Sequence, residues 1–312
     1  MSRVYLAVTI IVVLFAVNIL LVFKNNQDDS LIIQLASRYN GSLNGQAYIL
    51  PISGPNYIPI LDSSISAPKI DSKSAVIYDT KSRRFLYEKE SNIKLPIASL
   101  TKIMSAVVVL ENLNLDDIVT VFENSIKADG EKQDLYLGEK MSIRNLLKLM
   151  LIESSNDAAY ALMYYAKSRG IDFVGLMNSE AITTGMTDSY FTDPAGLDDG
   201  AYSTASDLIK LVEYSLKYQE IWDISAEKTA IVESSDERIK HQVTSTNRLL
   251  GLVKDIIGGK TGYTEGAGQC MILVTSVPDY PSKIISIVLG SGDRFGDTQK
   301  LIDWTRQAYR WQ

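Results

Sequence analysis

The chain is organised around Leu95-Pro96-Ile97-Ala98-Ser99-Leu100-Thr101-Lys102, which sets a hydroxyl and an amine three positions apart. Pro96 fixes its own backbone, and the run 103–110 that follows is apolar at nearly every position, as is typical of a helix buried in a domain core. Ser99 falls in the first turn, where the helix dipole favours negative charge. Lys102 shares a face with Ser99, and burial weakens the preference of an amine for its charged form. The stretch therefore predicts a serine nucleophile with a lysine base.

The Ser-x-x-Lys spacing alone has low specificity, because serine and lysine are common residues. It begins at four positions of this chain, Ser66, Ser91, Ser99 and Ser225. Only the occurrence at Ser99 opens an apolar helix. A serine that merely helps to cap a core helix is the alternative interpretation, so the rest of the chain has to decide.

The composition is that of a globular protein and argues against several functions. Of the 312 residues, 46% are hydrophobic and 22% are charged, enough for one large or two small domains. The formal charge is −6 and there is no dense lysine and arginine stripe, so we expect no nucleic acid as a partner. Cys270 is the single cysteine and His241 the single histidine, so we expect neither an intrachain disulfide nor a zinc site.

The N-terminal region predicts a membrane segment followed by a tether. Val4 to Phe23 is almost wholly apolar and is long enough to cross a hydrocarbon core of ~30 Å as a helix. No small-x-small cleavage signal closes it, which favours an uncleaved anchor over a secretory signal peptide. We therefore expect an anchor at 1–24, a linker rich in Asn, Ser, Asp, Gly and Pro at 25–72, and a folded domain at 73–312.

Hydrophobic patterning predicts strands on both sides of a helical block. Two short β-rich runs, 75–78 and 85–87, enclose a polar turn and predict an antiparallel hairpin. Further helices are predicted at 143–152, 158–166, 173–182, 204–218 and 298–310, and further strands at 255–263, 269–277 and 284–289. This order indicates an α/β domain with a helical insertion.

Two more motifs supply groups that an acyl-transfer site needs. Ser154-Ser155-Asn156 interrupts a helical run, so a hydroxyl and an amide project from a turn between helices, although a helix cap is an equal alternative. Lys260-Thr261-Gly262 occurs once, at the end of a predicted strand, where its glycine lets another backbone or a ligand approach. Its lysine and threonine can hold a carboxylate.

The order Ser-x-x-Lys, Ser-x-Asn, Lys-Thr-Gly is typical of penicillin-binding proteins and serine β-lactamases. From about residue 74 onward the chain resembles the low-molecular-mass penicillin-binding proteins of the D-alanyl-D-alanine carboxypeptidase family. The resemblance extends to Asp193-Pro194-Ala195-Gly196-Leu197, Tyr202-Ser203-Thr204-Ala205, Asn247-Arg248-Leu249-Leu250 and Gly259-Lys260-Thr261-Gly262-Tyr263-Thr264. It implies the β-lactamase/transpeptidase-like fold, an antiparallel sheet flanked by helices with an inserted all-helical subdomain.

The resemblance also implies roles for the motif residues. Ser99 would attack the carbonyl between two D-alanines, Lys102 would take its proton, and Ser154 would relay a proton to the leaving amine. The binding residues would be Asn156, Lys260, Thr261, Gly262 and Tyr263, with the N–H groups of Ser99 and Tyr263 as the oxyanion hole. Lys260 would also lower the proton affinity of Lys102. No metal or organic cofactor is implied.

Three alternative functions remain open. A D,D-endopeptidase that cuts peptidoglycan cross-links is the first alternative. A class A β-lactamase needs a deacylating glutamate between the second and third motifs, and 192–197 has none. A catalytically silent cell-wall binding protein is the third, and the intact Ser99, Lys102 and Lys260 argue against it.

The chain departs from the family pattern at two places. Ser155 stands where the family usually has glycine, which we expect to alter the cleft wall. The sequence also ends at Gln312, without the β-rich domain and amphipathic anchor that many relatives add, so we expect the N-terminal segment to replace that anchor. The expected partners are peptidoglycan stem peptides, β-lactams as covalent inhibitors, and the cell membrane, with the catalytic domain on its extracytoplasmic side.

Overall fold

A computed structural model describes residues 58–126 and 135–312. The strands are β1 (Ile60–Leu61), β2 (Ser74–Asp79), β3 (Arg84–Lys89), β4 (Ile118–Thr120), β5 (Lys140–Ser142), β6 (Thr229–Glu233), β7 (Lys240–Thr244), β8 (Ile256–Thr264), β9 (Gly268–Val277), β10 (Tyr280–Ser291) and β11 (Tyr309–Arg310). The helices are the 3-10 turn η1 (Ala98–Leu100), α2 (Thr101–Asn112), α3 (Glu123–Ile126), α4 (Ile143–Ile152), α5 (Asn156–Ser168), α6 (Phe173–Thr183), α7 (Ala205–Ser215), α8 (Gln219–Ala226) and α9 (Arg294–Ala308).

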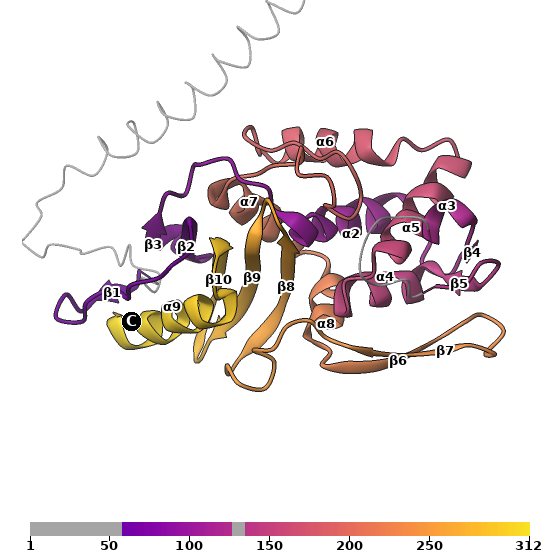
Figure 1. Ribbon diagram of the computed structural model, residues 1–312. Helices are drawn as coiled ribbons and strands as arrows, with labels where there is room; N and C mark the ends of the chain where they lie inside the picture. The colour runs from indigo at the N-terminus through magenta and orange to yellow at the C-terminus, as the bar shows by residue number, and fades with distance from the viewer. Residues whose placement is uncertain (1–57, 127–134) are drawn as a thin grey trace, which may run out of the picture. The chain divides into compact units, whose positions relative to one another are not determined.

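The main sheet of the described residues has five strands in the order β3-β2-β10-β9-β8, and every neighbouring pair is antiparallel. Alternate side chains of β2 face two separate cores, as the two-residue period of a strand requires. Ala75 and Ile77 belong to a core shared with α9, whereas Val76 and Tyr78 belong to the larger core shared with the other helices. The sheet therefore separates α9 from the helical part (Figure 1).

Helix α2 lies at the centre of the helical part and contacts α4, α5, α6, α7 and α8. Every residue from Thr101 to Val109 is buried, including Lys102 and Ser105. The predicted α/β architecture with an inserted helical block is confirmed, and α2 joins that block to the sheet beside η1 (Figure 1). The nucleophile motif is thus placed between the two parts of the fold.

Most predicted elements are present with shifted ends, but one predicted helix was wrong and one hairpin was missed. The helix predicted at 204–218 is two helices, since α7 ends at Ser215 and α8 starts at Gln219. The hairpin of β6 and β7 was not predicted, because each strand buries only one side chain, Val232 and Val243, and so lacks a clear alternation.

The predicted membrane segment, Val4 to Phe23, lies outside the described residues. Within the described ranges no helix is long and apolar enough to cross a membrane. Ile60 and Leu61 of β1 pair with Arg310 and Tyr309 of β11, so the folded part includes residues ahead of position 73.

Candidate active site

Ser99 lies at the junction between η1 and α2. Ala98 before it has a φ of 48°, in the left-handed region that residues other than glycine rarely adopt. Leu95, further ahead, exchanges two backbone hydrogen bonds of 3.0 Å with Ser203. The backbone ahead of Ser99 is thus held by its hydrogen bonds to Ser203. The Ser99 side chain itself is only partly buried.

The Lys102 amine lies in the middle of a polar cluster inside the protein. Its Nζ donates to Ser99 Oγ at 2.8 Å, to Asn156 Oδ1 at 2.8 Å and to the Ala195 carbonyl at 3.0 Å. The residue is 0% exposed. This burial lowers the pKa of Lys102 to about 7, although the nearby Asp193 carboxylate acts in the opposite direction. Near neutral pH a large share of this amine is therefore unprotonated and able to accept a proton.

The second motif occupies the turn between α4 and α5. Ser154 has a φ of 70°, so the backbone reverses there. Ser155 is fully buried and caps α5, since its hydroxyl accepts from the Ala158 N–H at 3.1 Å. The expectation that Ser155 alters the cleft wall is therefore wrong, because its side chain points into the fold. Asn156, the first residue of α5, reaches Lys102 instead.

Lys260 on β8 supplies the second buried amine of the site. Its Nζ donates to Ser154 Oγ at 2.7 Å, and the residue is 1% exposed. Burial first, and then the neighbouring Lys102 and Arg294 cations, hold the pKa of Lys260 well below its usual value.

The remaining residues of the third motif bring β8 against η1. Thr261 is buried, and its hydroxyl donates to Thr246 Oγ1 at 2.6 Å. A Cβ added to Gly262 would lie 3.0 Å from the Ser99 nitrogen, a tight contact, so glycine favours this close approach. Tyr263 follows with 62% of its surface exposed. The strand thus passes directly beside the Ser99 amide.

The structure brings the predicted residues of all three motifs to one place. Ser99, Lys102 and Asn156 form one hydrogen-bonded group, and Ser154 and Lys260 form a second. Within the described residues no group of His, Cys, Asp and Glu side chains could hold a metal ion.

Three contacts of the site were not predicted from the sequence. The Ala195 carbonyl accepts from Lys102, and Thr246 accepts from Thr261. Arg294, at the start of α9, donates through Nη1 to the Gly262 carbonyl at 2.7 Å. A backbone carbonyl leaves no signal in a sequence, whereas an arginine just after a glycine-rich strand end could have been considered.

Comparison with known proteins agrees with this geometry. The family model of the D-alanyl-D-alanine carboxypeptidases matches residues 62–293. The chain belongs to the D-alanyl-D-alanine carboxypeptidase family. Its match to that family includes all three motifs of the site and all five strands of the main sheet.

Relatives in this family include both carboxypeptidases and endopeptidases. The D-alanyl-D-alanine carboxypeptidase DacF of Bacillus subtilis is 30% identical over 77% of this chain, an alignment that spans 63% of DacF. A D-alanyl-D-alanine endopeptidase of Escherichia coli is 30% identical over 78% of this chain and 79% of its own length. A penicillin-binding protein of Listeria monocytogenes, solved with cefotaxime bound, is 31% identical over 77% of this chain and 98% of its own, with a TM-score of 0.68.

Proposed function

We propose that the protein is a serine D,D-carboxypeptidase, which removes the terminal D-alanine from peptidoglycan pentapeptide stems through an acyl-enzyme on Ser99. The observation that carries the proposal is the buried Lys102 amine, 2.8 Å from the Ser99 hydroxyl and with its pKa lowered to about 7. An amine with this pKa matches the work of a general base near neutral pH.

In the acylation step, Ser99 Oγ bonds to the carbonyl carbon of the penultimate D-alanine while its proton passes to Lys102 Nζ. The carbonyl oxygen becomes an oxyanion, for which we assign the N–H groups of Ser99 and Tyr263 as donors. When the oxyanion collapses, the C–N bond breaks. Because Ser154 Oγ accepts from Lys260, we assign Ser154 as a proton relay: its hydroxyl gives a proton to the leaving amine and regains one from Lys260. The proton that Lys260 gives up balances the one that Lys102 took from Ser99. Water then hydrolyses the ester, which frees the shortened stem and restores the Ser99 hydroxyl.

We assign the terminal carboxylate of the substrate to Lys260 and Thr261. The pKa of Lys260 is lowered in a site that holds no substrate carboxylate to balance its positive charge. An arriving carboxylate favours the protonated lysine, so binding of the substrate restores the cation that holds it.

The endopeptidase activity remains a second candidate, because the Escherichia coli endopeptidase aligns over more of its own length than DacF does. Both reactions use the same acyl-enzyme chemistry and differ only in the leaving group. β-Lactams are proposed to acylate the same serine, by analogy with the cefotaxime-bound Listeria protein.

The deciding assay gives the purified protein monomeric pentapeptide muropeptides and cross-linked dimers side by side. We expect free D-alanine from the pentapeptide. Separation of dimers without release of D-alanine would replace the carboxypeptidase with the endopeptidase.

We further propose that the protein is held at the cell membrane by the segment Val4 to Phe23, with the folded domain, residues 73–312 together with β1, as an extracytoplasmic D,D-peptidase domain. The apolar length of this segment supports the proposal. Removal of residues 1–26 should move the protein from the membrane fraction to the soluble fraction and leave penicillin binding intact. A native mature N-terminus downstream of Phe23 would contradict the anchor.

A further inference from the structure

The loop of residues 193–198 is built around the carboxylate of Asp193, which is 7% exposed. Its oxygens accept the backbone N–H groups of Ala195 at 2.7 Å, Gly196 at 2.6 Å, Leu197 at 3.1 Å and Asp198 at 3.0 Å. Hydrogen bonds to an ionised acceptor are among the stronger ones in proteins. This single side chain therefore fixes the path of the whole loop.

The loop contacts α2 and η1 at three points. The Pro194 carbonyl accepts from Ser105 Oγ at 2.6 Å, and the Ala195 carbonyl accepts from Lys102 Nζ at 3.0 Å. Gly196 packs so tightly that an added Cβ would lie 2.0 Å from the Ala98 carbonyl oxygen. The loop thus holds both the base and the turn that carries Ser99.

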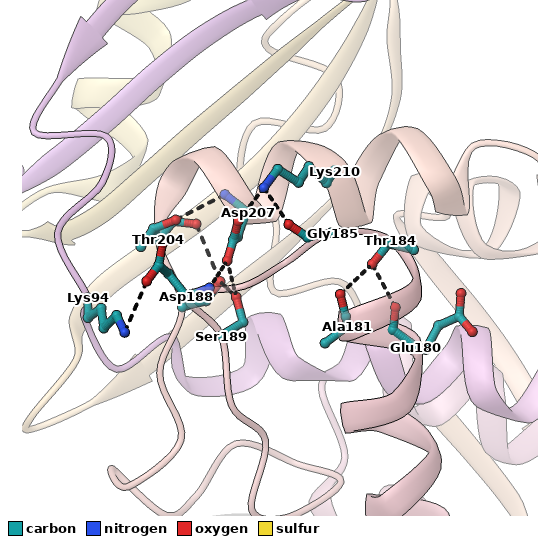
Figure 2. Close-up of polar contacts among 11 residues, drawn as sticks. Lys94, Glu180, Ala181, Thr184, Gly185, Asp188, Ser189, Thr204, Asp207 and Lys210 are labelled. Atoms are coloured by element: carbon teal, nitrogen blue, oxygen red, sulfur yellow. Dashed lines mark hydrogen bonds and ion pairs between the residues drawn. The ribbon is translucent and has the colours of Figure 1, made fainter.

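The 193–198 loop is part of the connection between α6 and α7, and hydrogen bonds and an ion pair hold this connection near both of its ends. Asp207 in the first turn of α7 accepts from the Asp188 N–H at 2.8 Å, from Ser189 Oγ at 2.9 Å and from Lys210 Nζ at 2.8 Å (Figure 2). Lys94 forms an ion pair of 3.0 Å with Asp188 (Figure 2). With its ends tied to α7 and to the segment ahead of Ser99, the connection has little freedom to shift.

The Ala195 carbonyl constrains the direction of the Lys102 lone pair. A neutral amine has two N–H groups and one lone pair in a tetrahedral arrangement. Asn156 Oδ1 and the Ala195 carbonyl are both acceptors, so they take the two N–H groups. The lone pair is then left facing the third neighbour, the Ser99 hydroxyl at 2.8 Å, which is the direction that proton transfer requires.

We propose that Asp193 is a positioning residue for acyl transfer: through the 193–198 loop it holds the Ala195 carbonyl where it aims the Lys102 lone pair at Ser99. This inference rests on the proposed function, because it assigns how the base of that reaction is oriented. Asp193 touches neither Ser99 nor substrate in this assignment and acts only through Ala195 and Lys102.

The charge of Asp193 acts on the pKa of Lys102, and a purely structural role of Asp193 would not. The Asp193 carboxylate raises the pKa of Lys102, against the stronger lowering by burial. Lys260 on β8 also lies close to Lys102, since the Lys102 cation helps to lower the pKa of Lys260. Loss of the Asp193 charge alone should therefore lower the pKa of Lys102.

The test measures the second-order rate constant for acylation by a fluorescent penicillin, in wild type and Asp193→Asn, from acid to alkaline pH. The amide offers one acceptor oxygen in place of two and carries no charge. We expect the plateau rate constant to fall about 10- to 100-fold, since small misplacements of a reacting group cost this much. We also expect the acid limb of the profile to move to lower pH. Asp172→Asn is the matched control, because Asp172 also accepts a backbone N–H, from Gly175, at a helix start away from the site.

An unmoved acid limb or an unchanged plateau in folded Asp193→Asn would overturn the inference. Thermal melting establishes whether this variant is folded. If it is not, Ser105→Ala carries the test, because it loosens the Pro194 anchor and leaves the charge in place. We then expect a lower plateau with an unmoved limb, and an unchanged plateau would overturn the inference. Failure of the proposed function is distinguishable, since wild type itself would then not be acylated.

Discussion

Two buried lysines dominate the chemistry of the site at the scale of single residues. Lys102 is 0% exposed and Lys260 is 1% exposed, and burial is the largest cause of the lowered pKa of each. Their hydrogen-bond partners differ: Lys102 contacts Ser99, whereas Lys260 contacts Ser154. In the proposed function, the same physical effect thus serves a base in one case and a carboxylate-binding group in the other.

Replacement of Lys260 tests its assignment to the substrate carboxylate. A hydrogen bond to a charged group contributes about 1.5–3 kcal/mol, and each 1.4 kcal/mol is about a factor of ten. Lys260→Ala should therefore lower kcat/KM for a D-alanyl-D-alanine peptide at least about 10- to 100-fold. The loss should be smaller on the amidated peptide.

Lys240→Ala serves as the control, because Lys240 is an exposed lysine on β7 that pairs with Glu233. The measurement is kcat/KM of each variant on the D-alanyl-D-alanine peptide with a free carboxylate and on the amidated peptide. Equal loss on both substrates in Lys260→Ala would leave Lys260 as a group that only tunes Lys102.

At the scale of elements, the site depends on a close packing of the 193–198 loop against η1. Gly196 has a φ of +75°, and an added Cβ would also lie 2.6 Å from Thr101 Oγ1. Neither the backbone conformation nor the space admits a side chain. The loop can lie this close to η1 only because residue 196 has no side chain.

Gly196→Ala should destabilise the protein by about 1–3 kcal/mol and slow acylation, because the new methyl pushes the loop away from η1. Gly170→Ala is the matched control, since Gly170 has a φ of +79° but nothing within 4 Å of an added Cβ. It shares the backbone strain without the clash. Urea unfolding and penicillin acylation of both variants give the comparison, and equal effects in the two would show that the contact with η1 is unimportant.

The sequence predicted the side chains of the site better than the backbone that holds them. Ser99 and Lys102 lie at the start of a helix, and Lys260 lies within β8, so periodicity together with the order of the three motifs was enough to find them. The Ala195 carbonyl and the cap formed by Ser155 depend on tertiary packing, which a local pattern does not encode. The β6 and β7 hairpin was missed for a similar reason, because its short strands are mostly exposed.

At the scale of the whole molecule, the buried lysines couple stability to pH. In the unfolded chain Lys102 has a pKa near 10.5, whereas the folded value is about 7. Between these values the unfolded state binds more protons than the folded state, so the free energy of unfolding rises with pH. Lys260 acts in the same direction. Above about pH 9 the raised pKa of Cys270, about 11, begins to oppose this gain.

Urea unfolding at pH 7.5 and pH 9.0 tests this coupling. We expect wild type to gain about 1–2 kcal/mol from Lys102 across this interval, since one proton difference is worth about 1.4 kcal/mol per pH unit, and Lys260 adds to this gain in the same direction. Lys102→Met should show a smaller gain, because it removes one of the two groups. Stability that stays level or falls with pH in wild type would contradict the lowered pKa values.

The central claim is that Ser99 is the nucleophile of an acyl-transfer site, and mass spectrometry after treatment with a penicillin tests it most directly. We expect one penicilloyl adduct on the wild-type protein, located by peptide mapping at Ser99. Ser99→Ala should fold, as judged by an unchanged circular dichroism spectrum, and should carry no adduct. An adduct on another residue, or one that persists in folded Ser99→Ala, would contradict the account.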